Sequence, residues 1–242
     1  MLTLLYYLVC LTAALVLYIA SIIAFVVCYP FDKRRVVVHT LSKWITDVIF
    51  GLPPLMKRRV EGFENMDPKQ PYVVVLNHNS MVDILCLYKV PFIFKWVSKK
   101  EVYRIPIVGR LLFLHGDIVI NRASTKEAMQ LVHDRGKEWL SKGASVCIFP
   151  EGTRSKSGEI QGFKAGAFIL AKDAGVPVLP IVLDGTRTLT RKGLVNWRNV
   201  ITIKILPPVS AEQIEARPIK EVMAEVRENM VATLAEIREN KR

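Results

Sequence analysis

Cysteine and histidine are scarce in this sequence, and their positions are far apart. The four cysteines are Cys10, Cys28, Cys86 and Cys147, and the four histidines are His39, His78, His115 and His133. Such spacing matches neither a disulfide framework nor the ligand pattern of a zinc site. We therefore expect no bound metal and a chain that folds in a reducing compartment.

Several functional patterns are also missing. The sequence has no internal repeat, no low-complexity tract and no Gly-x-Ser-x-Gly turn, which argues against an esterase of the nucleophile-elbow type. No nucleic-acid-binding motif accompanies the excess of 34 Lys and Arg over 22 Asp and Glu, a net charge of +12. This balance predicts an anionic partner, and an acidic membrane surface or a phosphorylated substrate fits better than nucleic acid. The length of 242 residues suits one domain with an appendage.

Charge is absent from Met1–Cys28, which is dominated by apolar residues. This run exceeds the roughly 20 residues that span a bilayer, so residues 1–31 are predicted to anchor the chain in a membrane. A secretory signal is the alternative, but the run lacks a basic start and exceeds the usual length of about 7–15 residues. Tyr29 suits the membrane interface, and the basic run Lys33–Arg35 predicts that this end is cytoplasmic.

Residues 32–55 are predicted to hold an amphipathic helix, Val36–Phe50, and a linker. Its apolar residues recur at helical spacing, and polar residues lie between them: Val37, Leu41, Trp44, Ile45 and Val48 against His39, Ser42, Lys43 and Asp47. The helix either lies in the membrane interface, forms a hairpin with the first segment, or packs on the domain. Gly51–Pro54 ends it, and the basic collar Lys57–Arg59 suits acidic headgroups.

Residues 56–242 alternate strand and helix patterns, which predicts an α/β domain. The expected strands are Tyr72–Leu76, Phe92–Val97, Asp117–Ile120, Val146–Phe149, Val178–Val182 and Val200–Leu206. The expected helices run from a capping box at Ser124–Glu127 to about Ser141, over Phe163–Ala174, and from Pro218 onward with a core stripe of Met223, Val226, Met230, Leu234 and Ile237.

A polar segment, Asn77–Asp83, interrupts two apolar runs where a strand is expected to pass into a helix. With His78 in the loop and Asp83 in the first helical turn, the carboxylate can accept a hydrogen bond from one imidazole nitrogen. That bond fixes the tautomer and leaves the other nitrogen free to take a proton. The alternative is that Ser80 and Asp83 only cap the helix and that His78 is an ordinary loop residue.

A second polar segment, Phe149–Ser155, follows the strand Val146–Phe149. Gly152 permits close approach of backbone to a ligand, and Arg154 can hold a phosphate through two parallel hydrogen bonds. The alternative is plain turn chemistry in which Glu151 pairs with an arginine.

Basic residues are predicted to end two other strands. Arg122 follows Asp117–Ile120, and Lys99 with Lys100 follows Phe92–Val97, so that Arg122 can share a rim with His78. Each of them alone is also consistent with a solvated surface charge. The run Val176–Val182 contains two prolines, which indicates an edge strand or the wall of a cleft.

Four blocks occur in order: Asn77-His78-x4-Asp83, Gly116-x3-Ile120-x-Arg122, Phe149-Pro-Glu-Gly-Thr-Arg154-Ser, and Val176-Pro-Val-x-Pro180. Together they resemble the glycerolipid acyltransferase family, and most closely its 1-acylglycerol-3-phosphate acyltransferases. The blocks span about residues 77–182, and the N-terminal segments also resemble bacterial members. The resemblance implies a mixed sheet flanked by helices and an N-terminal membrane helix or helical hairpin.

The resemblance also implies the chemistry. His78 would be the general base and Asp83 would orient it, while substrate would be bound by Lys99, Arg122, Glu151, Gly152, Thr153 and Arg154. The partners would be lysophosphatidic acid, membrane lipids and an acyl donor, either acyl-CoA or acyl carrier protein. No metal or held cofactor is implied. The product would be phosphatidic acid, made on the cytoplasmic face of the bacterial inner membrane.

Overall fold

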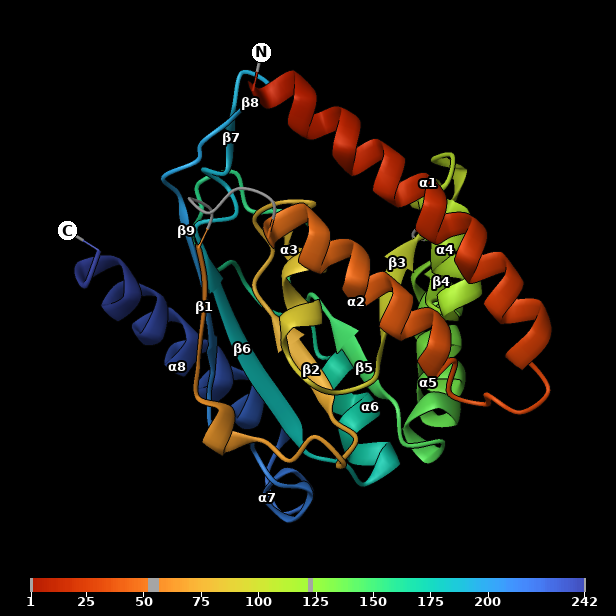
Figure 1. Ribbon diagram of the computed structural model, residues 1–242. Coiled ribbons are helices and arrows are strands. Elements are labelled where there is room, and N and C mark those ends of the chain that lie inside the picture. The colour runs from red at the N-terminus through yellow and green to blue at the C-terminus, as the bar shows by residue number, and fades with distance from the viewer. Residues whose placement is uncertain (1, 52–56, 122–123, 242) are drawn as a thin grey trace.

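The fold is built on a seven-stranded sheet with the order β1-β9-β6-β2-β5-β3-β4 (Figure 1). The computed structural model describes residues 2–51, 57–121 and 124–241. The strands are β1 (Lys57–Glu61), β2 (Val73–Leu76), β3 (Phe94–Lys99), β4 (Ile118–Ile120), β5 (Ser145–Ile148), β6 (Val178–Asp184) and β9 (Val200–Ile205), with a separate hairpin of β7 (Thr190–Arg191) and β8 (Leu194–Val195).

The sheet is mixed, as expected. β6, β2, β5, β3 and β4 are parallel neighbours, whereas β9 runs antiparallel to β6 and pairs in parallel with β1. All six predicted strands are present. β1 and the β7–β8 hairpin were not predicted, because β1 is rich in basic residues and the hairpin strands have only two residues each.

The helices divide between the two faces of the sheet. They are α1 (Leu2–Cys28), α2 (Val36–Gly51), α3 (Asp83–Cys86), α4 (Val108–His115), α5 (Thr125–Ser141), α6 (Gly166–Ala174), α7 (Ala211–Glu215) and α8 (Ile219–Glu239); short 3₁₀ turns cover Phe63–Asn65, Leu87–Lys89 and Lys100–Arg104. α2 and α3 cover one face with α1 outside them, and α5 to α8 cover the other. The proposed boundary between residues 55 and 56 lies outside the described residues, so this division of the chain stays a prediction.

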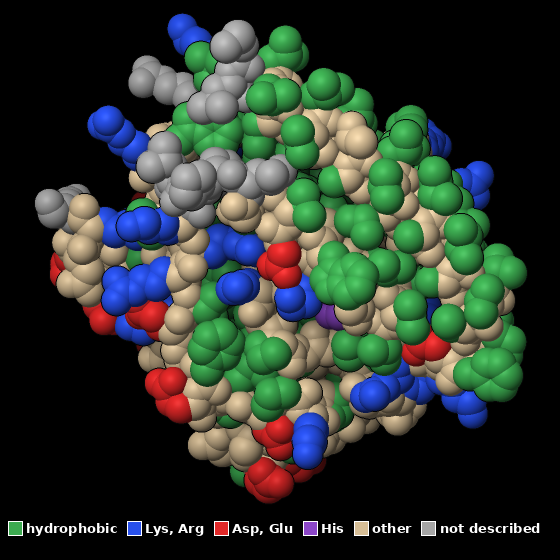
Figure 2. Space-filling model, viewed as in Figure 1, with side chains coloured by type: hydrophobic (Ala, Val, Ile, Leu, Met, Phe, Trp, Pro, Cys, Tyr) green, Lys and Arg blue, Asp and Glu red, His purple; other side chains and the backbone are tan. Residues whose placement is uncertain are grey.

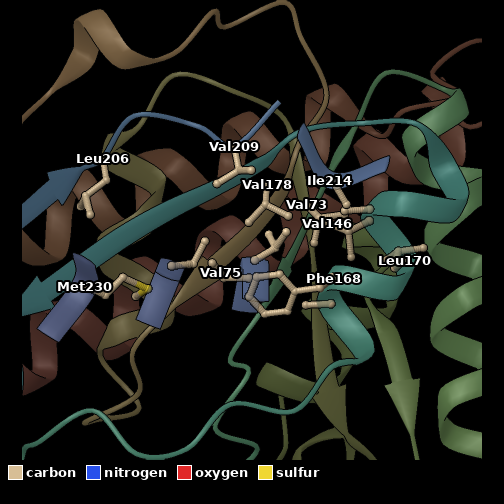
Figure 3. Close-up of a cluster of buried hydrophobic side chains, with 14 of the residues drawn as sticks. Val73, Val75, Val146, Phe168, Leu170, Val178, Leu206, Val209, Ile214 and Met230 are labelled. Atoms are coloured by element: carbon tan, nitrogen blue, oxygen red, sulfur yellow. The ribbon is translucent and has the colours of Figure 1, made fainter. Parts of the chain in front are cut away.

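Successive side chains of a strand point to opposite faces of the sheet, so the strands contribute to the hydrophobic cores on both faces. Val73 and Val75 of β2 pack toward Phe168 of α6 and Met230 of α8, as Figure 3 shows. Val74 and Leu76 point to the opposite core beneath α2 and α3. Because both faces are covered, β2 at the centre of the sheet is apolar at every position.

α8 carries the predicted core stripe almost as expected. Its buried residues are Val222, Val226, Met230, Leu234 and Ile237, so Val222 takes the innermost place predicted for Met223, which is partly buried. Pro218 is the N-cap residue that precedes the helix.

α1 lies along the domain with contacts at both of its ends. Near its start, the Tyr6 hydroxyl donates to Ile49 O and the Tyr7 hydroxyl donates to Gly193 O. Near its end, the Phe25 and Phe113 rings lie 6.4 Å apart. Within the described residues, one helical stretch, Thr3–Cys28, is long and apolar enough to cross a membrane, and its apolar side chains form a band on the surface (Figure 2).

α2 is present as predicted, but its polar side chains face the domain. His39, Ser42 and Thr46 are buried with Val38, Ile45 and Phe50, whereas Val37 is 38 % and Trp44 is 55 % exposed. The expected apolar stripe is therefore divided: Ile45 is buried, Leu41 and Val48 are partly buried, and Val37 and Trp44 are exposed. A buried polar network, described below, supplies partners for this face.

Two of the predicted basic clusters are only partly exposed. Arg35 folds back to donate to Phe113 O and Leu114 O at the end of α4, and its guanidinium lies over the Phe25 ring. The Arg58 side chain is 8 % exposed and pairs with Asp47 at 3.1 Å. Both arginines serve tertiary packing, and their neighbours in sequence carry the surface charge.

The expectation of an edge strand at Val176–Val182 is wrong. β6 lies inside the sheet, between β9 and β2. Pro180 is tolerated because its carbonyl accepts from Leu206 N on the β9 side, at the point where the β6–β9 ladder ends with Ile181 opposite Ile205. Its missing N–H therefore falls beyond the regular pairing.

Candidate active site

The predicted functional segments meet at one edge of the sheet. β2, β5, β3 and β4 are parallel, so their carboxyl ends lie on the same edge, a usual place for ligand sites in α/β folds. His78 follows β2, Glu151–Arg154 follows β5, and Lys99 ends β3. Arg122, which follows β4, lies outside the described residues.

Asn77 fixes the point where β2 gives way to the loop. Its side-chain nitrogen donates to Leu183 O at 2.8 Å, and its side-chain oxygen accepts from Leu183 N at 2.7 Å. The amide thus extends the ladder between β2 and β6 by one pair. The sequence signal was present, since asparagine can supply both a donor and an acceptor, but its partner is 106 residues away.

His78 and Asp83 are in direct contact, as the sequence predicted. His78 Nδ1 lies 2.8 Å from Asp83 Oδ2, and the Asp83 side chain is completely buried. The same oxygen accepts from Asn79 N at 2.7 Å and Ser80 N at 2.8 Å. With an ionised carboxylate as acceptor, Nδ1 carries the hydrogen and Nε2 presents its lone pair.

The capping interpretation is not confirmed, because the N-cap residue of α3 is Val82 and no side chain caps this helix. Asp83 is the first residue of α3, and its bonds to two preceding backbone N–H groups hold the turn together. One carboxylate therefore both shapes the loop and orients the imidazole.

Two aromatic rings form a stack behind His78. The His78 and Phe149 rings have centroids 3.9 Å apart and planes inclined by 13°, and Phe149 stacks in turn on Trp96 at 5.0 Å. This stack restricts rotation of the imidazole. Sequence reasoning missed both residues, although Phe149 directly precedes the Pro-Glu-Gly-Thr turn.

Glu151 holds the backbone of His78. Its Oε1 accepts from His78 N at 2.8 Å and its Oε2 accepts from Gln161 N at 2.9 Å, while Ser155 N donates to His78 O at 2.7 Å. Burial raises the pKa of the Glu151 carboxyl, and the two backbone N–H donors oppose this shift. Both carboxylate oxygens are occupied by backbone, so the structure contradicts the predicted pairing of Glu151 with an arginine.

The backbone conformation at position 152 favours glycine. Its φ of +76° lies in the left-handed region that favours glycine, and a Cβ built there would lie 3.2 Å from both Cε and Nζ of Lys164. Lys164 thus crosses the turn, and its own N–H donates to Pro150 O. No pattern in the sequence predicts this contact.

The basic side chains at this edge are available to a ligand. Arg154 and Lys99 are exposed, and neither has a hydrogen bond or ion pair within the part of the chain that the structure describes. Thr153 is exposed on the same turn. Among the described residues, no group of three or more His, Cys, Asp and Glu is arranged to hold a metal ion.

A second polar cluster is buried beneath α2. His39 Nδ1 lies 2.9 Å from His115 Nε2, His115 Nδ1 lies 2.7 Å from Asp117 Oδ1, and Lys95 Nζ donates to His115 O. Burial lowers the pKa of both histidines and lowers the pKa of Lys95 to about 7. The histidines looked scattered in the sequence, but two of them form this contact between α2 and α4.

Known proteins are similar to this chain in sequence and in fold. Residues 57–184 match the family described as Acyltransferase. A 1-acyl-sn-glycerol-3-phosphate acyltransferase from Pseudomonas aeruginosa is 34% identical over 212 residues, 86% of this chain and 80% of that protein. One from Chlamydomonas reinhardtii is 37% identical over 186 residues, 74% of this chain and 55% of that protein. The chain spans about half the length of this and a similar chloroplast relative.

The fold has a solved counterpart. The crystal structure of the 1-acyl-sn-glycerophosphate (LPA) acyltransferase PlsC from Thermotoga maritima superposes with a TM-score of 0.70 at 25% identity, covering 96% of this chain and 98% of that one. The family match covers more than half of the chain, and the Pseudomonas relative is covered over most of its length. The mixed sheet with a histidine–aspartate pair at its carboxyl edge is thus the scaffold of a chain that belongs to the acyltransferase family.

Proposed function

We propose that this chain transfers an acyl group from an acyl thioester to the sn-2 hydroxyl of 1-acylglycerol-3-phosphate, giving phosphatidic acid. The observation that carries the proposal is the His78–Asp83 pair at the carboxyl edge of the sheet, the edge that also carries Arg154 and Lys99, two exposed cations with no ion pair to a described residue. The relatives named as 1-acyl-sn-glycerol-3-phosphate acyltransferases support the choice of acceptor.

The reaction needs no enzyme nucleophile, because the acceptor hydroxyl itself attacks the thioester carbonyl. His78 Nε2 takes the hydroxyl proton as the new C–O bond forms, and Asp83 stabilises the resulting imidazolium. Collapse of the tetrahedral intermediate breaks the C–S bond, and the imidazolium returns the proton to the leaving thiolate. The acyl donor, acyl-CoA or acyl carrier protein, is thus a co-substrate, and no other cofactor is needed.

The acceptor's phosphate is assigned to the cations at the same edge. Arg154 offers a planar fork for two phosphate oxygens, and Lys99 adds a point charge. Arg122 belongs to this proposal by its place after β4. Gly152 and Thr153 shape the turn that carries Arg154, whereas the contacts of Glu151 indicate a positioning role.

Membrane attachment belongs to the same proposal, since lysophosphatidic acid and phosphatidic acid are membrane lipids. α1 contacts the domain at both ends while its apolar side chains form an exposed band, so the helix suits insertion parallel to a membrane surface (Figure 2). We place the catalytic domain on the cytoplasmic face, where Lys33 and Arg34 lie exposed at the end of α1.

The test is acyl transfer by the purified chain with a labelled thioester and lysophosphatidic acid. His78→Ala should reduce kcat by about 10²–10⁴-fold, the usual contribution of general-base catalysis. His133→Ala, which changes an exposed histidine on α5, is the matched control and should leave turnover unchanged.

Near-normal turnover in a folded His78→Ala protein would remove the proposed base. Lipid binding without acyl transfer by the unaltered chain would instead favour a membrane-anchored lipid-binding protein. Parallel assays with acyl-CoA and with acyl carrier protein identify the donor.

A further inference from the structure

The segment between β6 and β9 has an unusual charge composition. Residues 185–199 contain four basic side chains and no acidic one: Arg187, Arg191, Lys192 and Arg198. Lys192 and Arg198 are exposed, and neither forms an ion pair with a described residue. Since the segment includes no carboxylate, its charge is available to an anionic partner.

The same segment presents apolar and aromatic side chains beside α1. Leu194, at the start of β8, is 63 % exposed. The Trp197 ring meets the Tyr6 ring edge-to-face at 5.1 Å, and the Tyr7 hydroxyl donates to Gly193 O. Trp and Tyr favour the boundary between lipid headgroups and acyl chains, so this combination of side chains is typical of a membrane interface.

The position of the hairpin links this surface to the proposed chemistry. The segment leaves β6 at the edge where Asn77 bonds to Leu183, one residue before His78. The N-terminus of the chain lies beside β7 and β8, at one end of the apolar band of α1 (Figures 1 and 2). A contact with lipid here would hold the catalytic edge next to the surface from which a lipid acceptor comes.

We propose that the β7–β8 hairpin, residues 190–198, is a second membrane contact, which binds the acidic headgroups of a lipid bilayer beside the start of α1. The inference deepens the proposed function and rests on its membrane assignment. Leu194 enters the interface, the partly buried Trp197 holds the hairpin against α1, and Lys192 and Arg198 meet lipid phosphates. The bilayer is favoured over a protein partner because the surface continues the exposed apolar band of α1.

The test measures how the full chain divides between two vesicle populations, one zwitterionic and one containing anionic phospholipid. The hairpin variant carries Lys192→Asn and Arg198→Gln; asparagine suits the φ of +50° at position 192. Each cation near an anionic surface contributes about fivefold to binding, so the variant should lose about 25-fold of its preference for anionic vesicles at low salt. High salt should shrink this difference.

The control variant carries Lys69→Gln and Lys220→Gln, which remove the same charge from exposed positions outside the hairpin. Lys69 precedes β2, and Lys220 lies in the first turn of α8, away from the carboxyl edge. Equal losses in the two variants would show that only net charge matters and would overturn the proposal. Melting curves of both variants confirm that they are folded.

Hydrogen exchange of the unaltered chain provides an independent measurement. Amides of residues 190–198 should exchange more slowly on anionic vesicles than on zwitterionic ones, whereas those of α7 should not change. Unchanged exchange in the hairpin would overturn the proposal. Acyl transfer to lysophosphatidic acid in detergent micelles is assayed separately, so failure of the catalytic assignment is distinguished from failure of the hairpin contact.

Discussion

A single buried carboxylate serves two purposes at the centre of the proposed site. Asp83 Oδ2 accepts from the His78 imidazole and from two backbone N–H groups, while Oδ1 has no hydrogen-bond partner among the described residues. Three donors on one carboxylate oxygen hold the side chain in the position that orients the imidazole. The same bonds that shape the turn before α3 therefore also orient the proposed base.

Arg154 should determine which acceptor is preferred. Because its guanidinium has no partner among the described residues, Arg154→Ala should leave the melting temperature nearly unchanged. Leaving a phosphate incompletely paired costs about 1–3 kcal/mol, or about 5- to 150-fold in kcat/KM. We expect a loss of this size for lysophosphatidic acid and a smaller loss for lysophospholipids whose phosphate is capped by choline or ethanolamine.

Kinetics on three acceptors measure this prediction. Arg154→Lys should recover only part of the preference, because an ammonium keeps the charge without the planar fork. Arg135→Ala on α5, which breaks an exposed ion pair with Glu138, is the control. Equal loss for every acceptor together with a lower melting temperature would assign Arg154 a structural role.

At the scale of elements, the loop after β5 is held between two parts of the chain. On one side Glu151 and Ser155 bond to the backbone of His78. On the other side, Arg227 of α8 donates to Gln161 O at 2.9 Å and to Ile160 O at 3.1 Å. Gln161 N in turn donates to Glu151, which also accepts from His78 N. A chain of hydrogen bonds therefore connects α8 to the backbone of His78.

Arg227→Ala should therefore lower kcat more than it raises KM. Small displacements of a catalytic group cost up to about 100-fold in rate, so we expect a loss of about 10- to 100-fold in kcat. Arg227→Lys should restore part of the rate, since an ammonium can still donate to one of the two carbonyl oxygens. Steady-state kinetics with lysophosphatidic acid as the varied substrate measure the changes in kcat and in KM separately.

Arg217→Ala supplies the comparison for this prediction, because Arg217, which precedes α8, pairs with Glu225 of that helix. It should lower stability slightly, as surface ion pairs do, without changing kcat. If Arg227→Ala and Arg217→Ala have the same kinetic effect, Arg227 influences turnover only through the stability of the folded protein.

At the scale of the whole molecule, a buried histidine pair attaches α2 to the sheet. Burial, reinforced by neighbouring cationic groups, lowers the pKa of His39 and His115, whose ordinary value is 6.5. Below that value the unfolded chain binds protons that the folded chain does not. The stabilising effect of keeping these groups neutral is thus complete above about pH 6.5 and is lost as the pH falls toward the folded-state pKa values.

His39→Gln should reduce this pH dependence. Between pH 7 and pH 5 the melting temperature of the unaltered chain should fall more steeply than that of the variant, because the variant lacks one histidine whose pKa is lowered by folding. His133→Gln, at an exposed position, should keep the full slope. Identical slopes for all three proteins, from melting curves at each pH, would show that His39 does not contribute.

Local patterns in the sequence determined most of the elements and the composition of the site. Apolar runs bounded by turn residues predicted six of the seven strands of the main sheet, and helical periodicity predicted α2, α5 and α8. Spacing alone indicated the hydrogen bond between His78 and Asp83, because both residues belong to one short turn. The order of four motifs indicated the family. These features are predictable because each depends on residues close together in the chain.

Only the tertiary structure decided which side chains are available to a ligand. Glu151 and Arg154 look alike as candidates, but the backbone of Gln161 and His78 occupies the Glu151 carboxylate, whereas Arg154 bonds to none of the residues that the structure describes. His39 lay among the polar positions of α2, but His115, 76 residues away, gives it a buried partner. Pro180 suggested an edge, yet the ladder with β9 ends beside it. In each case the deciding contact joins residues far apart in sequence, and local periodicity carries no information about such pairs.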